Sequence, residues 1–169
     1  MIRILATFFV LLLFSLSYAL DHTAFFRVLV DVPGWEASRP EGMTVNSGGQ
    51  RQLTAHREYT KGSSSLSVTV MCGPGAQGAA FFFSGMNDMF LSGQGGSLRV
   101  KSLTLQGRPA KVVMTDGGLT FYVLLSKVAS NPSTTAIMVF DFRGVDYNRA
   151  VSVIRRFPIQ EAVRLARGI

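Results

Sequence analysis

The sequence predicts an α+β domain, in which an antiparallel β-sheet of about six or seven strands packs against a central helix and a C-terminal helix on one face. Three observations lead to this prediction. Apolar and polar residues alternate with a period of two along most of the chain. The period changes to three or four residues over 79–91 and again after residue 146, as in amphipathic helices. The turns between the strand candidates are short, which is typical of antiparallel neighbours.

The length fits a single domain, because 169 residues are too few for two domains of ordinary size. We assign residues 1–19 to a signal peptide, 20–27 to an N-terminal tail of the mature chain, and 28–169 to one α+β domain. The single cysteine excludes an internal disulfide framework. Lysines and arginines outnumber aspartates and glutamates by 17 to 10, and the resulting charge of +7 favours anionic partners.

The first twenty residues have the features of a secretory signal. Arg3 supplies a positive start, residues 4–14 form an almost unbroken apolar run, and residues 17–19 include the small side chains that signal peptidase accepts. We therefore expect export by the Sec route, cleavage after Ala19 and a periplasmic location. The alternative is an uncleaved anchor in the inner membrane, because the 17 residues 4–20 reach the lower limit of a bilayer-spanning helix.

The first half of the domain predicts a strand followed by a hairpin. Residues 28–32 form a β-branched run that ends at a Pro-Gly pair, so we expect a strand there. Residues 53–60 and 66–71 both alternate with a period of two, on either side of the link 62–65. This pattern predicts a β-hairpin.

The second half predicts a helix, a meander of strands and a closing helical region. Apolar residues recur at steps of three and four over 79–91, which predicts an amphipathic helix that the glycine-rich stretch 92–97 ends. Asp146 is placed to cap a helix that Pro158 interrupts, and a helical stripe resumes over 159–166. The four strand candidates of the meander are 98–105, 110–115, 119–126 and 135–142.

This order of elements resembles a known family. The residues that carry the resemblance are the Pro33-Gly34-Trp35 step after an apolar strand and Tyr59 in the hairpin, followed by a central helix, a meander and a closing helix. Together they resemble the bacterial periplasmic relatives of PsbP, including DcrB-type proteins, over most of residues 28–157. The resemblance implies a non-enzymatic accessory or binding protein, and it assigns no functional residue to this chain.

A glycine motif over 73–78 has the G-x-G-x-x-G pattern of dinucleotide sites and lies between a predicted strand and a predicted helix. The preceding strand belongs to a hairpin, however, and no acidic residue follows at about 20 residues to hold a ribose. Pro74 also removes one backbone N–H from the loop. We therefore interpret the motif as a strand-to-helix turn.

Cys72 and His56 form the candidate site of an enzyme. If the hairpin closes around residues 61–65, Thr54 lies opposite Cys72, His56 lies diagonally within reach of the thiol, and Glu58 shares their face. A thiol, an imidazole and a carboxylate are the components of a nucleophilic site. A slip of one residue would move the two side chains to opposite faces and leave Cys72 as a small buried hydrophobic residue.

His22 is the candidate metal ligand, on condition that cleavage follows Ala19. The mature chain would then begin Leu20-Asp21-His22, so that its amine, two backbone nitrogens and the imidazole could form a square-planar site for Cu(II) or Ni(II). The alternative is a solvated terminus that binds no metal.

Arginines are concentrated near the C-terminus, where Asp146 and Glu161 are the only acidic residues. They form either a solvated helix surface or a surface that docks to an acidic envelope protein or an anionic membrane. Nucleic acid is not an expected partner of an exported protein. The candidate binding residues are Arg149, Arg155, Arg156, Arg164 and Arg167.

These observations favour an exported, non-enzymatic accessory or interaction protein that presents a sheet-and-helix surface. We assign it no catalytic residue and no cofactor, because two histidines and one cysteine are too few for a metal cage or an imidazole-based triad. The alternative is a small envelope enzyme or metal-binding protein that uses Cys72 and His56, or His22 at the mature N-terminus.

Overall fold

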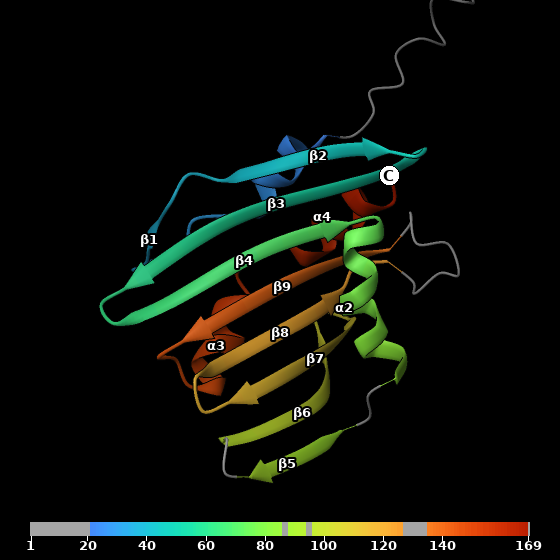
Figure 1. Ribbon diagram of the computed structural model, residues 1–169. Helices are drawn as coiled ribbons and strands as arrows, with labels where there is room; N and C mark the ends of the chain where they lie inside the picture. The colour runs from blue at the N-terminus through green and yellow to red at the C-terminus, as the bar shows by residue number, and fades with distance from the viewer. Residues whose placement is uncertain (1–20, 86–87, 94–95, 127–134, 169) are drawn as a thin grey trace, which may run out of the picture.

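The computed structural model describes residues 21–85, 88–93, 96–126 and 135–168 (Figure 1). Within these ranges, no helix combines the length and the apolar character needed to cross a bilayer, and the predicted signal sequence lies outside them. The elements in chain order are the 3₁₀ helix η1 (His22–Val28), β1 (Glu36–Ala37), β2 (Glu41–Ser47), β3 (Gln50–Lys61), β4 (Ser64–Cys72), α2 (Pro74–Gly85), β5 (Met89–Gly93), β6 (Gly96–Leu105), β7 (Arg108–Thr115), β8 (Gly118–Leu124), β9 (Ala136–Arg143), α3 (Tyr147–Ile154) and α4 (Ile159–Ala166).

The strands form one antiparallel sheet in the order β1-β3-β4-β9-β8-β7-β6-β5, with β2 paired to β3 beside β1. This confirms the α+β class and the antiparallel sheet. The sheet has nine strands, more than the six or seven predicted. Strands β1, β2 and β5 were not predicted. The two longer ones, β2 and β5, lie at the edges of the sheet, where the alternation of apolar and polar residues is weak.

Helices cover both faces of the sheet. In β4, Leu66, Val68 and Val70 are fully buried in the main core, which also contains side chains of η1, α3 and α4. Met71 points to the opposite face, because neighbouring strand residues alternate, and it packs in a second cluster with Ala76 of α2. We call these two sides the helix face, covered by η1, α3 and α4, and the α2 face. The prediction that the central and C-terminal helices share one face is therefore wrong: the two lie on opposite sides (Figure 1).

The N-terminal segment is helical where the sequence predicts a tail and then a strand. Residues His22–Val28 form η1, and the following residues up to Val32 are not in a strand. Phe25, Leu29 and Val32 are buried, and they follow one another at steps of four and three residues. This spacing lets a helical turn and the irregular segment after it pack on the core. Residues 22–27, assigned to a tail, are thus part of the domain's packed structure.

The central helix begins and ends earlier than predicted over 79–91. Pro74 is its first residue, a position where proline costs no hydrogen bond. The helix ends at Gly85, and Met89–Gly93 then forms β5 at the sheet edge. The glycine motif is a strand-to-helix turn, as expected: Gly73 has a φ of 85°, and a Cβ atom there would collide with the backbone oxygen of Arg51.

The C-terminal helices agree with the sequence prediction. The Asp146 carboxylate accepts a hydrogen bond of 3.0 Å from the backbone N–H of Arg149 and caps α3. Pro158 separates α3 from α4. Both helices bury their apolar sides, including Ile154 and Ile159, against the sheet.

Candidate functional site

The five candidate arginines lie on the outer side of the α3–α4 layer. All five are exposed, because the apolar sides of these helices are packed against the sheet. Gln160 and Arg164 of α4 and the C-cap residue Arg167 are spaced by four and three residues, which places the three on one exposed side. Among the described residues, none of the five arginines forms an ion pair.

The two acidic residues that could offset these arginines are engaged elsewhere. The Asp146 carboxylate caps α3, as described above. The Glu161 carboxylate pairs with Arg27 of η1, with an Nε–Oε1 distance of 3.0 Å. Neither carboxylate forms an ion pair with the five arginines, so the outer side of the α3–α4 layer carries an excess of positive charge.

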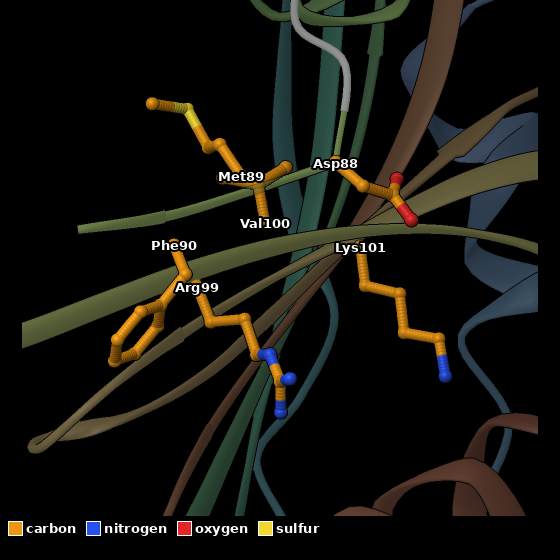
Figure 2. A pocket seen from close by; sticks show the side chains of 6 residues that line it. All are labelled: Asp88, Met89, Phe90, Arg99, Val100 and Lys101. Atoms are coloured by element: carbon orange, nitrogen blue, oxygen red, sulfur yellow. The ribbon is translucent and has the colours of Figure 1, made fainter.

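A second cationic group lies on the edge hairpin of β5 and β6 (Figure 2). Arg99 and Lys101 are exposed and flank the buried Val100. Their cross-strand partners in β7 are Met114 and Val112, which pack in the main core, so both cations belong to the helix face. This group was not predicted from the sequence, although the alternation of Arg99, Val100 and Lys101 in a strand is a signal that could have revealed it.

An exposed apolar side chain accompanies the cations of this hairpin. Phe90, the cross-strand partner of Arg99, is 63% exposed on the helix face, whereas the neighbouring Leu91, which is 56% exposed, points to the α2 face. Figure 2 shows Phe90 and Arg99 on the same side of the strands, with the Arg99 guanidinium carbon 6.0 Å from the centre of the Phe90 ring. A hollow of about 360 Å³ lies between the two strands' side chains.

Asp88 is the carboxylate of this hollow, and it is held by the backbone. Its Oδ1 accepts a hydrogen bond of 2.7 Å from the N–H of Ser102. Hydrogen bonding to Ser102 lowers the pKa of Asp88, with smaller contributions from the charges of Lys101 and Lys111. Asp88 therefore stays ionised at neutral pH. Arg99 is in none of the ion pairs formed by the described residues.

The structure does not bring Cys72 and His56 together. Leu53 lies opposite Cys72, and His56 lies opposite Thr69, so the register differs by one residue from the arrangement that would join them. Cys72 is buried in the main core, and this burial raises the pKa of its thiol to about 12. A thiol of that kind is a poor nucleophile, because the thiolate is the reactive form.

His56 has other partners on the α2 face. Its Nε2 lies 2.7 Å from Glu58 Oε1, and its Nδ1 lies 2.9 Å from Thr69 Oγ1. Histidine and glutamate do share a face, as predicted, but the thiol is absent from it.

His22 is tied into the fold at the start of η1. Its Nδ1 lies 2.7 Å from Asp21 Oδ1, and its backbone N–H donates to the same carboxylate and to Thr44 Oγ1. The hydrogen bond from Thr44 is the main cause that lowers the pKa of Asp21. The predicted metal site would need that backbone nitrogen as a ligand, and Leu20 lies outside the described residues. The described part of the chain contains no group of three or more His, Cys, Asp or Glu side chains positioned to hold a metal ion.

Comparison of the chain with protein-family models, with curated proteins and with solved structures found no match. The resemblance to the PsbP relatives therefore stays a prediction from the sequence.

The geometry favours surface binding by charge. The helix face presents two groups of exposed cations, one on α3, α4 and their connections and one on β6, and the second group lies beside the exposed ring of Phe90. Such a combination attracts anionic surfaces over a distance of about 10 Å at ordinary ionic strength.

Proposed function

We propose that this chain is exported to the periplasm and, after cleavage of residues 1–19, acts as a non-enzymatic accessory protein that binds an anionic membrane surface through its helix face. The observation that carries the proposal is the set of five exposed arginines on the α3–α4 layer, which no described carboxylate compensates. The resemblance to periplasmic relatives of PsbP supports a role without catalysis.

One feature favours a membrane over an acidic protein as the partner. Phe90 is exposed beside Arg99 and Lys101 on the helix face, and the headgroup region of a bilayer accepts this mixture of apolar and basic side chains.

The charges are sufficient for measurable binding. A lysine or arginine close to an anionic membrane contributes about 1 kcal/mol, so the five arginines together contribute about 5 kcal/mol. Salt screens this attraction. We therefore expect binding that requires anionic lipid and weakens steeply as the ionic strength rises.

Vesicle sedimentation tests the proposal with a chain of residues 20–169, which retains every described element. Wild type should bind vesicles of phosphatidylcholine and phosphatidylglycerol but not phosphatidylcholine alone. The variant Arg155→Glu/Arg156→Glu should bind more weakly by at least about tenfold, since it reverses two of the contributing charges. The control is Arg39→Glu/Arg143→Glu, which makes the same change in net charge at exposed residues outside the α3–α4 layer.

An equal loss in both variants would mean that net charge alone is responsible and would overturn the assignment of the surface. Binding to polyglutamate together with no binding to anionic vesicles would replace the membrane by an acidic protein as the partner.

A further inference from the structure

The α2 face carries a concavity that lies beside α2. The helix packs over the end of the sheet at Leu124 and Ile137. Next to it, a hollow of about 460 Å³ is lined by α2 and by strands β4, β8 and β9. This volume lies within the range of small-molecule sites.

One wall of the concavity is apolar. Met71, Ala79, Val139 and Tyr122 line it, and all four pack against the second hydrophobic cluster of the sheet. Because this cluster supports them from behind, the wall is a fixed surface on which an apolar group can pack.

The other wall is polar and carries a negative charge. Ser67, Thr69 and Asp141 line it. Thr120 Oγ1 donates a hydrogen bond of 2.8 Å to Asp141 Oδ1 and fixes the carboxylate. Glu58 lies opposite Ser67 on the same face and adds a second carboxylate near the rim, where it pairs with His56.

Asp141 forms no ion pair with a described residue. Lys111 is the cross-strand neighbour of Tyr122 on this face, and its charge contributes to lowering the pKa of Asp88. Burial and the Asp141 charge raise the pKa of Tyr122, which keeps its phenol neutral. The concavity therefore combines a carboxylate that forms no ion pair among the described residues, an aromatic ring and an apolar wall.

We propose that this concavity binds a small organic cation, namely a primary amine that carries an apolar group. The ammonium donates to the Asp141 carboxylate, and the apolar group packs on Met71, Ala79 and the Tyr122 ring. A charge-assisted hydrogen bond is stronger than a neutral one, and the ring face adds attraction for a cation. An anionic ligand is disfavoured by Asp141 and Glu58. This site is independent of the arginine layer, which lies on the other side of the sheet.

Calorimetric titration with three matched probes tests the site. Phenethylamine is the cationic probe, 2-phenylethanol replaces its amine by a hydroxyl group, and phenylacetate carries a negative charge. Phenethylamine should bind the wild type more tightly than 2-phenylethanol, and phenylacetate should not bind. Asp141→Asn keeps an oxygen for Thr120 but removes the charge. It should weaken phenethylamine by at least about tenfold, the effect of a hydrogen bond to a charged group, and leave 2-phenylethanol unchanged.

Two further variants complete the test. Glu58→Gln is the control, because it removes a carboxylate of the same face that already pairs with His56, and it should change the affinity for phenethylamine by less than the Asp141 variant does. Ala79→Arg fills the concavity from α2 with a cation and should abolish binding, even if the Asp141 variant is poorly folded. The proposal is overturned if the wild type does not distinguish phenethylamine from 2-phenylethanol, if it binds neither at millimolar concentration, or if the amine binds both the Asp141 and the Ala79 variants as it binds the wild type.

Discussion

The phenol of Tyr59 donates a hydrogen bond of 2.9 Å to the carbonyl oxygen of Val30. Tyr59 is fully buried in β3, and its ring packs edge-on against Phe157, 5.8 Å between ring centres. The hydrogen bond joins the N-terminal segment to the sheet, and the ring contact joins the sheet to the connection between α3 and α4. It therefore helps to hold η1 and the α3–α4 layer together on the helix face.

Removal of this hydroxyl should destabilise the domain. Tyr59→Phe keeps the ring but leaves the Val30 carbonyl without its partner, which costs about 1–3 kcal/mol in a buried setting. Tyr147→Phe is the control, because Tyr147 is half-buried at the start of α3 and forms no side-chain hydrogen bond with a described residue. Urea denaturation measures both. Equal free energies of unfolding for the two variants would contradict the role assigned to the Tyr59 hydroxyl.

The buried thiol of Cys72 should make stability depend on alkaline pH. In the unfolded chain the thiol ionises near its ordinary pKa of 9.0, whereas burial raises the pKa to about 12 in the folded protein. Between these values the folded state binds more protons, so the free energy of unfolding falls as the pH rises. Below pH 9 the two states bind equally and the dependence disappears.

Cys72→Ala isolates this contribution. The variant is less stable at every pH because it leaves a small cavity, but its stability should fall less steeply between pH 9 and pH 12. Tyr59, whose pKa burial also raises to about 12, contributes equally to both proteins. Parallel curves for wild type and variant would show that the thiol ionises normally in the fold.

Gly73 should tolerate no side chain. Its φ is 85°, and an added Cβ atom would collide with the Arg51 backbone, so Gly73→Ala should cost more than the roughly 1–2 kcal/mol of a left-handed alanine alone. Gly48 has a φ of 57° and open space around it, which makes Gly48→Ala the matched control for the conformational cost. Thermal unfolding compares the two variants. A Gly73→Ala protein as stable as the control would mean that no close backbone approach exists at this turn.

The alternating strands of the sheet could be predicted because each buries one face. Strand β2 could not, since nearly all of its residues are exposed and no period of two is visible. Phe90 and Leu91 fit the helical spacing of the preceding residues, yet they belong to an exposed edge strand. Their apolar character therefore extended the predicted helix past its end at Gly85.

The candidate sites were harder to predict, because one residue of register decides which side chains meet. The hairpin between β3 and β4 pairs Lys61 with Ser64 and turns through Gly62 and Ser63. Gly62 has a φ of 58°, which such a tight turn requires. A turn longer by one residue would have placed Thr54, and not Leu53, opposite Cys72. The arginines of α3 and α4 were easier to predict, since amphipathic spacing alone places charged residues outward.

The Phe90 ring should contribute to membrane binding without contributing much to stability. Phe90→Ser removes an exposed side chain, so the free energy of unfolding should change by only about 0.5 kcal/mol. The affinity of this variant for vesicles that contain phosphatidylglycerol should fall severalfold. The control is Met43→Ser, because Met43 is 59% exposed at the opposite edge of the sheet, close to the 63% of Phe90. If both variants bind vesicles equally well, the β5–β6 hairpin is not part of the docking surface.

A fluorophore on each face of the sheet shows whether the helix face or the α2 face meets the membrane, and we expect contact at the helix face. Ser152→Cys places a label on the exposed side of α3, and Thr60→Cys places one on the α2 face; both residues are exposed, and the native Cys72 is buried from the reagent. With vesicles of phosphatidylcholine and phosphatidylglycerol, an environment-sensitive NBD label at residue 152 should shift to the blue and be quenched by brominated lipid, while the label at residue 60 should not respond. A response at residue 60 with none at residue 152 would mean that the α2 face, and not the helix face, meets the membrane.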